Sequence, residues 1–174
     1  MTVDIENRSD GSMIAGDVFD GFEHFTFSNW SEFLQLLAAN DWHTLYAHNG
    51  GGWDYLSLVE HLLRARGASL SAMLSGSTVI GFLGSFEGRS IRMLDSLRLF
   101  FASLEKVGKA FSPETPKLKV EVLPEELWNT DRLKFWEYLR RDTETLYHSL
   151  IRFQGIVNEI APIGELGMTL ASTA

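Results

Sequence analysis

The 174-residue sequence contains no cysteine and only four prolines, and it has no run of about 18 apolar residues. The absence of cysteine excludes disulfides and thiolate metal sites, which fits a reducing compartment such as the cytoplasm. The absence of a long apolar run predicts no transmembrane helix. The acidic N-terminus has no apolar segment behind it, so no secretory signal is expected either. We therefore expect a cytoplasmic protein with no membrane partner.

Basic residues are also scarce, and the net charge of −8 argues against a simple basic nucleic-acid binder. Residues 1–60 hold 10 acidic residues and one basic residue, whereas residues 61–141 hold 13 of the 15 basic residues and 9 acidic ones. An acidic first part can supply metal ligands, and the middle can supply phosphate contacts. Charge alone equally fits a solvated middle segment of mixed charge. The five histidines do not have the spacing of zinc ligands.

The length predicts one domain, and a hydrophobic content of 45% with 12 Phe is enough for a full core. Two apolar segments, 12–19 and 22–27, flank Asp20-Gly21 and predict a β-hairpin. Apolar periodicity predicts the remaining elements. These are strands at 2–5, 43–47, 70–74, 78–83, 91–94 and 118–123, helices at 31–40, 53–67, 97–101 and 104–111, and a long helix from about 130 to 160. This order predicts an α/β sheet covered by helices, with Asp4 and Glu6 on its central strand.

Three short patterns with oxygen-bearing side chains follow one another along the chain. They are Asp4-x-Glu6, Asn49-Gly-Gly-Gly-Trp53-Asp54 and Tyr138-x-x-x-Asp142. Each alone is common as a strand end, a glycine turn or a hydrogen bond on a helix surface. Together they would bring four carboxylates and one phenol to a common point, and such hard ligands hold Mg²⁺ or Mn²⁺.

The expected secondary structure gives these side chains a shared direction. Asp4 and Glu6 would lie on one face of a strand, where the side-chain period is two. Asp142 would lie one helical turn from Tyr138 and complete the shell of a first ion, while Tyr138 holds the attacking water. Asp54 would position a second ion directly or through water. Two ions about 3.5–4 Å apart are a recurrent means of cleaving phosphodiesters.

With these motifs, the chain resembles the 3′→5′ proofreading exonuclease domain of protein-primed family B DNA polymerases of phages and organelles. That domain belongs to the DEDDy branch of the DnaQ-like, RNase H-like superfamily. The three patterns are similar to its three exonuclease motifs. In addition, Asp95-Ser96-Leu97 resembles the Ser-Leu motif with which the family contacts single-stranded DNA, and Lys117 stands downstream of it, where the family has a catalytic lysine.

The resemblance implies an α/β, RNase H-like (DnaQ-like) mixed sheet flanked by helices, with an exonuclease domain at 1–160 and a tail at 161–174 that resembles the join to a polymerase domain. It implies metal-dependent release of nucleoside monophosphates from single-stranded DNA 3′ ends, in proofreading, replication or repair, with two Mg²⁺ or Mn²⁺ ions. The chain would be either an excised domain or a free-standing exonuclease, and in the second case a separately encoded DNA polymerase is an expected partner, in the host cytoplasm if a phage encodes the chain. The implied catalytic residues are Asp4, Glu6, Asp54, Tyr138, Asp142 and Lys117, of which the four acids bind metal, and the implied nucleic-acid contacts are Asn7, His48, Asn49, Trp53, Ser96 and Leu97.

Departures from the family and several alternatives remain open at this point. Trp53 stands where the family has Phe or Tyr, only three residues precede Asp4, and no polymerase sequence follows. Trp53 could equally be a core residue, Asn49 could only cap its turn, and Ser96 could be only a helix N-cap. Lys119 is the second candidate for the catalytic lysine. An exoribonuclease and a non-catalytic module that binds DNA or docks a polymerase are the alternative functions, although the complete set of acids favours an enzyme.

Overall fold

A computed structural model describes residues 1–50, 54–65, 67–75, 78–160 and 166 of the chain. Seven strands and six helices occur in these ranges. In chain order they are β1 (Thr2–Asn7), β2 (Met13–Phe19), β3 (His24–Phe27), α1 (Trp30–Ala39), β4 (Thr44–Ala47), α2 (Asp54–Arg64), β5 (Ser69–Ser75), β6 (Thr78–Phe86), β7 (Arg89–Asp95), α3 (Leu97–Phe100), α4 (Leu104–Phe111), α5 (Pro124–Thr130) and α6 (Arg132–Ile160). The prediction of a mixed α/β sheet flanked by helices is confirmed.

The strands form one mixed sheet in the order β3-β2-β1-β4-β7-β6-β5. The pairs β1–β4 and β4–β7 are parallel, and the other pairs are antiparallel. The strand with Asp4 and Glu6 is interior, but the middle strand is β4. The expectation of a central strand for these acids is therefore off by one strand. The reason is that the chain adds an outer hairpin, β5–β6, beside β7.

Local sequence accounts for the first turns. Asp20 accepts hydrogen bonds from the backbone N–H groups of Phe22 and Glu23, each at 2.8 Å, and Gly21 takes a φ of 107°. Such a φ is open to glycine and strained for most other residues. The predicted hairpin is thus confirmed as β2–β3. Helix α1 begins slightly before the expected Ser31, because Asn29 caps it by accepting from the N–H of Glu32 at 3.0 Å.

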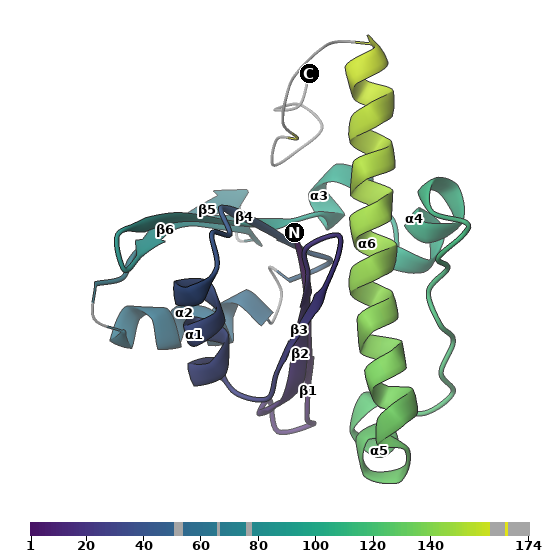
Figure 1. Ribbon diagram of the computed structural model, residues 1–174, viewed down its shortest axis with the longest axis horizontal. Helices are drawn as coiled ribbons and strands as arrows, with labels where there is room; N and C mark the ends of the chain where they lie inside the picture. Colours follow the sequence, from purple (N-terminus) through teal and green to yellow (C-terminus); the bar gives the residue numbers. More distant parts are fainter. Residues whose placement is uncertain (51–53, 66, 76–77, 161–165, 167–174) are drawn as a thin grey trace.

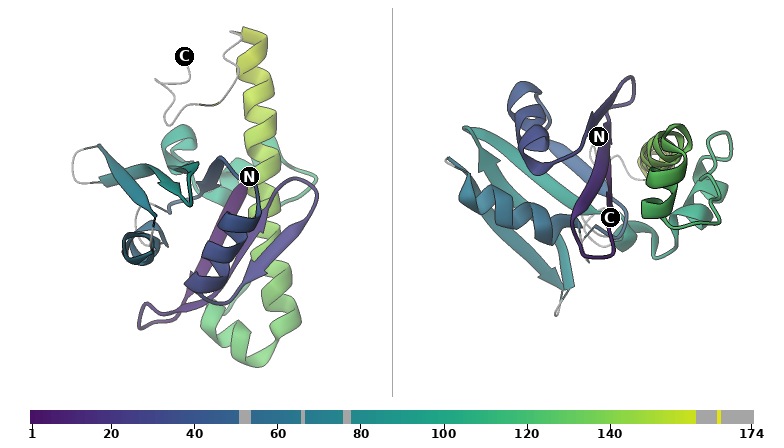
Figure 2. Two further views of the ribbon diagram at one scale, coloured as in Figure 1. Left: turned by 60° about the vertical axis from the view of Figure 1, so that its left-hand side comes forward. Right: turned by 90° about the horizontal axis from the view of Figure 1, so that it is seen from below.

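Side chains along β1 alternate between the two faces of the sheet. Val3 and Ile5 point into the main core, beneath α1 and α2. The alternate residues Asp4 and Glu6 face the opposite side of the sheet, where α6 lies. Figures 1 and 2 show α1 and α2 on one side of β1–β3 and the long α6 on the other. The acids therefore lie between the sheet and one helix.

The segment before α5 differs from the prediction. Residues 118–123 form no strand, and an unexpected helix, α5, begins at Pro124. Leu118, Val120 and Val122 alternate as in a strand, but they pack against the apolar cluster of α5 and α6 instead of pairing with another strand. Apolar alternation is the same in both cases, because it records only that one side of an extended segment is buried.

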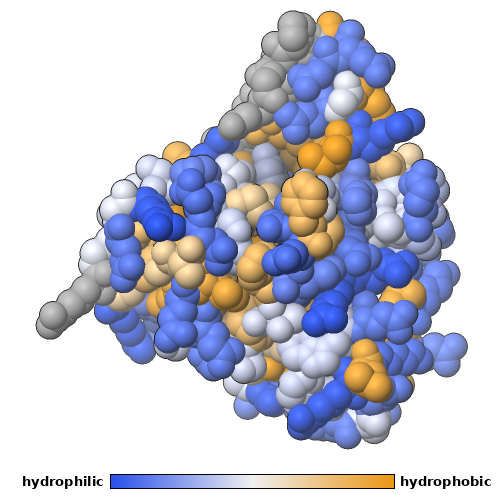
Figure 3. Space-filling model, viewed as in Figure 1, coloured by the Kyte–Doolittle hydropathy of each residue, from blue (hydrophilic) through white to orange (hydrophobic). Residues whose placement is uncertain are grey.

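Apolar side chains gather between the sheet and the upper half of α6 on the face shown in Figure 3, and hydrophilic residues cover most of the rest of this face. Within the described ranges, no helix is long and apolar enough to cross a membrane.

Candidate metal centre

Three of the predicted acids come together between β1 and α6. Asp4, Glu6 and Asp142 each place a carboxylate oxygen within 4.8 Å of the others. Asp142 is buried, with 3% of its surface exposed, and the two acids on β1 are partly buried. The two acids of the strand and the acid of the helix thus converge, as the sequence predicts.

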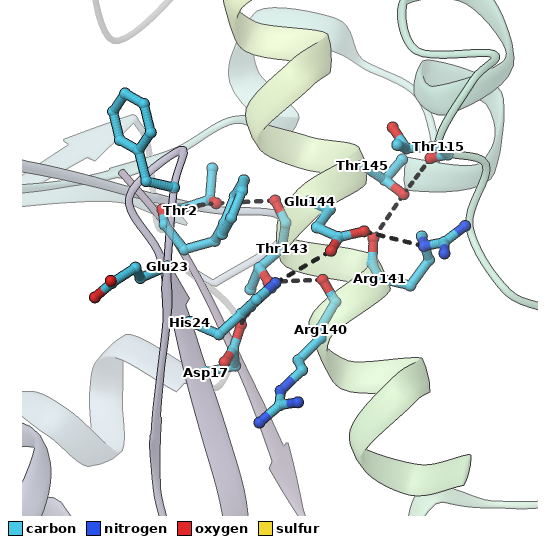
Figure 4. Close-up of polar contacts among 12 residues, drawn as sticks. Thr2, Asp17, Glu23, His24, Thr115, Arg140, Arg141, Thr143, Glu144 and Thr145 are labelled. Atoms are coloured by element: carbon cyan, nitrogen blue, oxygen red, sulfur yellow. Dashed lines mark hydrogen bonds and ion pairs between the residues drawn. The ribbon is translucent and has the colours of Figure 1, made fainter. Parts of the chain in front are cut away.

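Helix α6 is held against the sheet by the residue that follows Asp142. The hydroxyl of Thr2 donates to the backbone carbonyl of Thr143 at 2.9 Å, and the hydroxyl of Thr143 donates to Asp17 on β2 at 2.6 Å (Figure 4). Asp17 is fully buried, and burial raises the pKa of its carboxyl, while the bonds from Thr143 and His24 oppose the rise. These bonds fix the rotation of α6 that turns Asp142 toward β1.

A second contact joins β2 and β3 to α6. The ring of His24 lies between two carboxylates, with Nδ1 2.8 Å from Asp17 and Nε2 3.1 Å from Glu144 (Figure 4). Glu144 also pairs with Arg141 at 3.1 Å on the helix. The β2–β3 hairpin is therefore tied to the turn of α6 that carries Asp142.

Lys117 brings a positive charge into the cluster from the loop between α4 and α5. Its ammonium group contacts Asp142 Oδ2 and lies 5.1 Å from the ring centre of Tyr138. Burial alone would lower the pKa of Lys117, but Asp142, Asp4 and Glu6 outweigh it, so the net pKa is raised and the ammonium form is favoured. The hydroxyl of Thr145 donates to the carbonyl of Thr115 at 2.7 Å, which holds this loop on α6.

The clustered acids resist ionisation. The pKa of Glu6 is raised to about 7, because burial and the charge of Asp142 outweigh the hydrogen bond of Tyr138 and the charge of Lys117. Burial also raises the pKa of Asp142, and Lys117 opposes that rise. The pKa of Tyr138 is raised by burial and by the nearby carboxylates, so its hydroxyl keeps its proton.

These residues fit a divalent cation. The donor set consists of carboxylate oxygens, which suit Mg²⁺ and Mn²⁺. Asp142 Oδ1 is buried and accepts no hydrogen bond from the described residues. A cation beside Asp142 would satisfy that oxygen and relieve the repulsion among the three acids.

A hollow of about 440 Å³ adjoins the cluster and is lined by residues from three loops and helix ends. The lining residues are His48, Asn49, Leu97, Ser103, Leu104, Glu105 and Lys117. We call this hollow the groove. Lys117 belongs both to its wall and to the acidic cluster. The structure therefore brings together four residues that the sequence assigned to nucleic acid or catalysis, namely His48, Asn49, Leu97 and Lys117.

Other predicted residues lie elsewhere. Ser96 is fully buried behind the groove, where its hydroxyl bonds the carbonyl of Ala47 at 2.9 Å. Asn7 is at the end of β1, beyond Glu6, at a shift in strand register. Lys119, the second candidate for the catalytic lysine, is 80% exposed and pairs with Glu105 at 3.4 Å.

Two predicted positions cannot be placed with the others. Trp53 lies outside the described residues, as do most of the glycines before it. Asp54 is the first residue of α2, and its side chain is likewise outside the description. Their roles stay predictions, as does the proposed tail, of which only Leu166 is described.

The sequence motifs assign no role to Asp95, although it stands directly before Ser96 and Leu97. Asp95 is 2% exposed, and its carboxylate accepts hydrogen bonds from both sides of the groove. The sequence does contain a signal for this residue, because Asp95 directly follows the apolar segment 91–94, at the carboxyl end of the predicted strand.

Neither the comparison with family models nor that with curated proteins finds a match. Solved structures do match. Phi29 DNA polymerase complexed with primer-template DNA and incoming nucleotides aligns with a TM-score of 0.70 and 16% identity, over 99% of this chain and 32% of the polymerase. The same polymerase with single-stranded DNA gives 0.69 and 16%, over 98% and 33%. The family B DNA polymerase from the hyperthermophilic archaeon Pyrobaculum calidifontis gives 0.64 and 17%, over 99% and 26%.

At these identities the match establishes a shared fold. The predicted fold class is confirmed in this respect as well, since the sheet and its flanking helices occur in family B DNA polymerases. The chain spans about one third of the phi29 polymerase, at 32–33% of its length.

Proposed function

We propose that this chain is a metal-dependent 3′→5′ exonuclease that removes nucleoside monophosphates from single-stranded DNA. The observation that carries the proposal is the convergence of Asp4, Glu6 and Asp142 beside Tyr138 and Lys117, the last of which also lines the groove. The fold supports it, because the same fold occurs in a polymerase solved with single-stranded DNA. It also agrees with the motif resemblance, which depends on these same residues.

The acidic cluster would hold the divalent ions, with Asp4, Glu6 and Asp142 as ligands and Asp54 as the proposed further ligand. When bound, such ions lower the pKa of the attacking water and stabilise the leaving oxygen. Glu6 must lose its proton to serve as a ligand, and its pKa of about 7 makes this step sensitive to pH near neutrality.

Tyr138 and Lys117 have different tasks. Because its pKa is raised, the hydroxyl of Tyr138 stays a hydrogen-bond donor, and it orients the attacking water. The ammonium group of Lys117 holds Asp142 in place and offers positive charge to the scissile phosphate, whose charge increases in the transition state. Neither group needs to transfer a proton for these tasks.

The groove would bind the end of the strand. Asn49 offers amide groups for a sugar or phosphate, Leu97 offers an apolar surface for a base, and His48 adds a ring at the wall. Lys117 joins the groove to the acids, so a strand lying in the groove would place its terminal phosphodiester at the metal cluster.

The test is digestion of labelled oligonucleotides with Mg²⁺ or Mn²⁺. Single-stranded DNA with a 5′ label should shorten one nucleotide at a time, and a 3′ label should leave in the first product, a mononucleotide. Faster digestion of RNA of the same sequence would support the exoribonuclease. DNA binding without cleavage would support the non-catalytic module. Products that shorten from the 5′ end would contradict the proposal.

A further inference from the structure

Asp95 lies where two adjacent parallel strands end. It is the last residue of β7 and is paired in register with Ala47, the last residue of β4. The segments that follow these strands carry Asn49, in the loop after β4, and Leu97, the first residue of α3, and both lie on the wall of the groove. Asp95 is 2% exposed, so its carboxylate lies beneath this wall and outside the groove itself.

One oxygen of Asp95 joins the loop after β4 to the start of α3. Its Oδ1 accepts a hydrogen bond from the backbone N–H of Asn49 at 2.8 Å and another from that of Leu97 at 3.0 Å. Bonds from N–H groups to a carboxylate are stronger than those between neutral groups. Asn49 has a φ of 65°, a left-handed conformation uncommon outside glycine, and it needs support from its surroundings. The carboxylate provides that support.

The neighbouring Ser96 orients the ring of His48. The hydroxyl of Ser96 donates its one proton to the carbonyl of Ala47 at 2.9 Å. The oxygen can then only accept from His48, whose Nδ1 is 3.0 Å away. The proton of the His48 ring is thereby placed on Nδ1. Asp95 and Ser96 together orient three groove residues from below without lining the groove.

From this arrangement we infer that Asp95 is a positioning residue for nucleic-acid binding. Its carboxylate sets the distance between Asn49 and Leu97, and this distance determines how tightly the groove holds the 3′-terminal nucleotides of a single strand. The inference rests on the proposed function for its ligand. The inferred role differs from that of the catalytic residues, because Asp95 acts through the backbone of Asn49 and Leu97 and is not a member of the acidic cluster.

Two variants and a matched control separate positioning from simple stability. Asp95→Ala removes the acceptor, whereas Asp95→Asn keeps an oxygen that can accept both bonds. Asp20→Ala is the control, because Asp20 also accepts two backbone N–H bonds, from Phe22 and Glu23, in the remote β2–β3 turn. The affinity for a fluorescent single-stranded oligonucleotide is measured in excess chelator, so that it does not depend on cleavage. The KM and kcat values are then measured with Mn²⁺.

Asp95→Ala should weaken DNA binding and raise KM by at least about tenfold, while kcat falls much less, because the reacting groups are untouched. Asp95→Asn should recover most of the affinity, and Asp20→Ala should bind DNA as the wild type does even if it melts earlier. Unchanged affinity in folded Asp95→Ala would overturn the inference, as would equal losses in Asp95→Asn and Asp95→Ala.

A measurement on the wild type covers the case in which Asp95→Ala does not fold. The amide protons of Asn49 and Leu97 should exchange slowly with solvent, because both are donated to Asp95, and exchange at unprotected rates would overturn the inference. Failure of the proposed function is a separate result. It would appear as intact DNA in the cleavage assay, whatever the affinities and exchange rates are.

Discussion

The ammonium group of Lys117 contacts the carboxylate of Asp142, and this ion pair lies where β1, α6 and the loop after α4 meet. The same carboxylate is a proposed metal ligand, and its second oxygen accepts no hydrogen bond from the described residues. Lys117 and a divalent ion would therefore share Asp142, and positive charge from either one stabilises it.

Lys117→Met should lower the free energy of unfolding in chelator, because it leaves a buried carboxylate without its cation. Breaking a buried pair costs about 3–5 kcal/mol, and the partial exposure of Lys117 puts the expected loss at the lower end of that range or below. Mn²⁺ should reduce this loss by neutralising Asp142. Denaturant unfolding with and without Mn²⁺ measures both effects. Lys119→Met, at an 80% exposed position, is the control and should change little. A loss of the same size with and without Mn²⁺ would contradict the shared role of Asp142.

Tyr138→Phe should lower kcat by roughly 10²-fold, within the range for loss of a positioned catalytic hydroxyl, and should leave the number of bound ions unchanged. It should also shift metal binding to higher pH, since the hydrogen bond from Tyr138 lowers the pKa of Glu6. Single-turnover cleavage and Mn²⁺ titration over a pH series measure the two effects. A full loss of metal binding would instead make Tyr138 part of the scaffold of the metal centre.

The pH dependence of metal binding follows from Glu6. Its pKa rises on folding, from 4.5 to about 7, so its contribution to stability is present below the lower value and is lost as pH rises through about 7. The metal requires the ionised form. Mn²⁺ affinity should therefore increase by up to about tenfold per pH unit and level off above pH 7, with proton release below it. Calorimetry in buffers of different ionisation heat counts the protons. Glu6→Gln should bind the metal more weakly and lose this dependence, and an affinity that is flat with pH in the wild type would refute the assignment.

DNA binding should weaken as salt rises. For a single strand, the slope of log affinity against log salt is about −0.7 per phosphate neutralised. Blunt duplex DNA should be degraded more slowly than single strands, because fraying its end breaks stacking of about 1.4 kcal/mol per step. Affinity measurements at several salt concentrations and parallel digestion of both substrates provide the test. Equal rates on both substrates would show that the groove does not select a separated strand end.

The sequence predicted the metal cluster because its ligands follow local periods. Asp4 and Glu6 are two residues apart on a strand, and Tyr138 and Asp142 are four apart on a helix, so each pair shares a face whatever the rest of the chain does. The convergence of the two pairs required the right fold, which the motif resemblance supplied. The hairpin at Asp20-Gly21 was likewise predicted from a local pattern, because Asp-Gly between two apolar segments is typical of a hairpin turn.

The features that were missed depend on tertiary packing. An extended apolar segment at 118–123 could pack against helices as well as pair in a sheet, and it does the former. Ser96 was expected to contact DNA, but its side chain turns inward to Ala47 and His48, a direction that no spacing along the chain encodes. Asp95 binds the backbone of Asn49, which is 46 residues away in the sequence, as well as that of the nearby Leu97. These contacts exist because the fold places β4 and β7 side by side.

The most direct test of the account is the rate of mononucleotide release from single-stranded DNA with Mn²⁺ by the wild type, Asp142→Ala and Glu159→Ala. Glu159 is an exposed acid on the same helix, about 25 Å further along at 1.5 Å per residue. We expect wild-type rates for Glu159→Ala, rates below about 1% of wild type for Asp142→Ala, which loses a metal ligand, and no release by any of the three in excess chelator. Release by Asp142→Ala at the wild-type rate, or undiminished release in chelator, would contradict the proposal of a metal-dependent exonuclease.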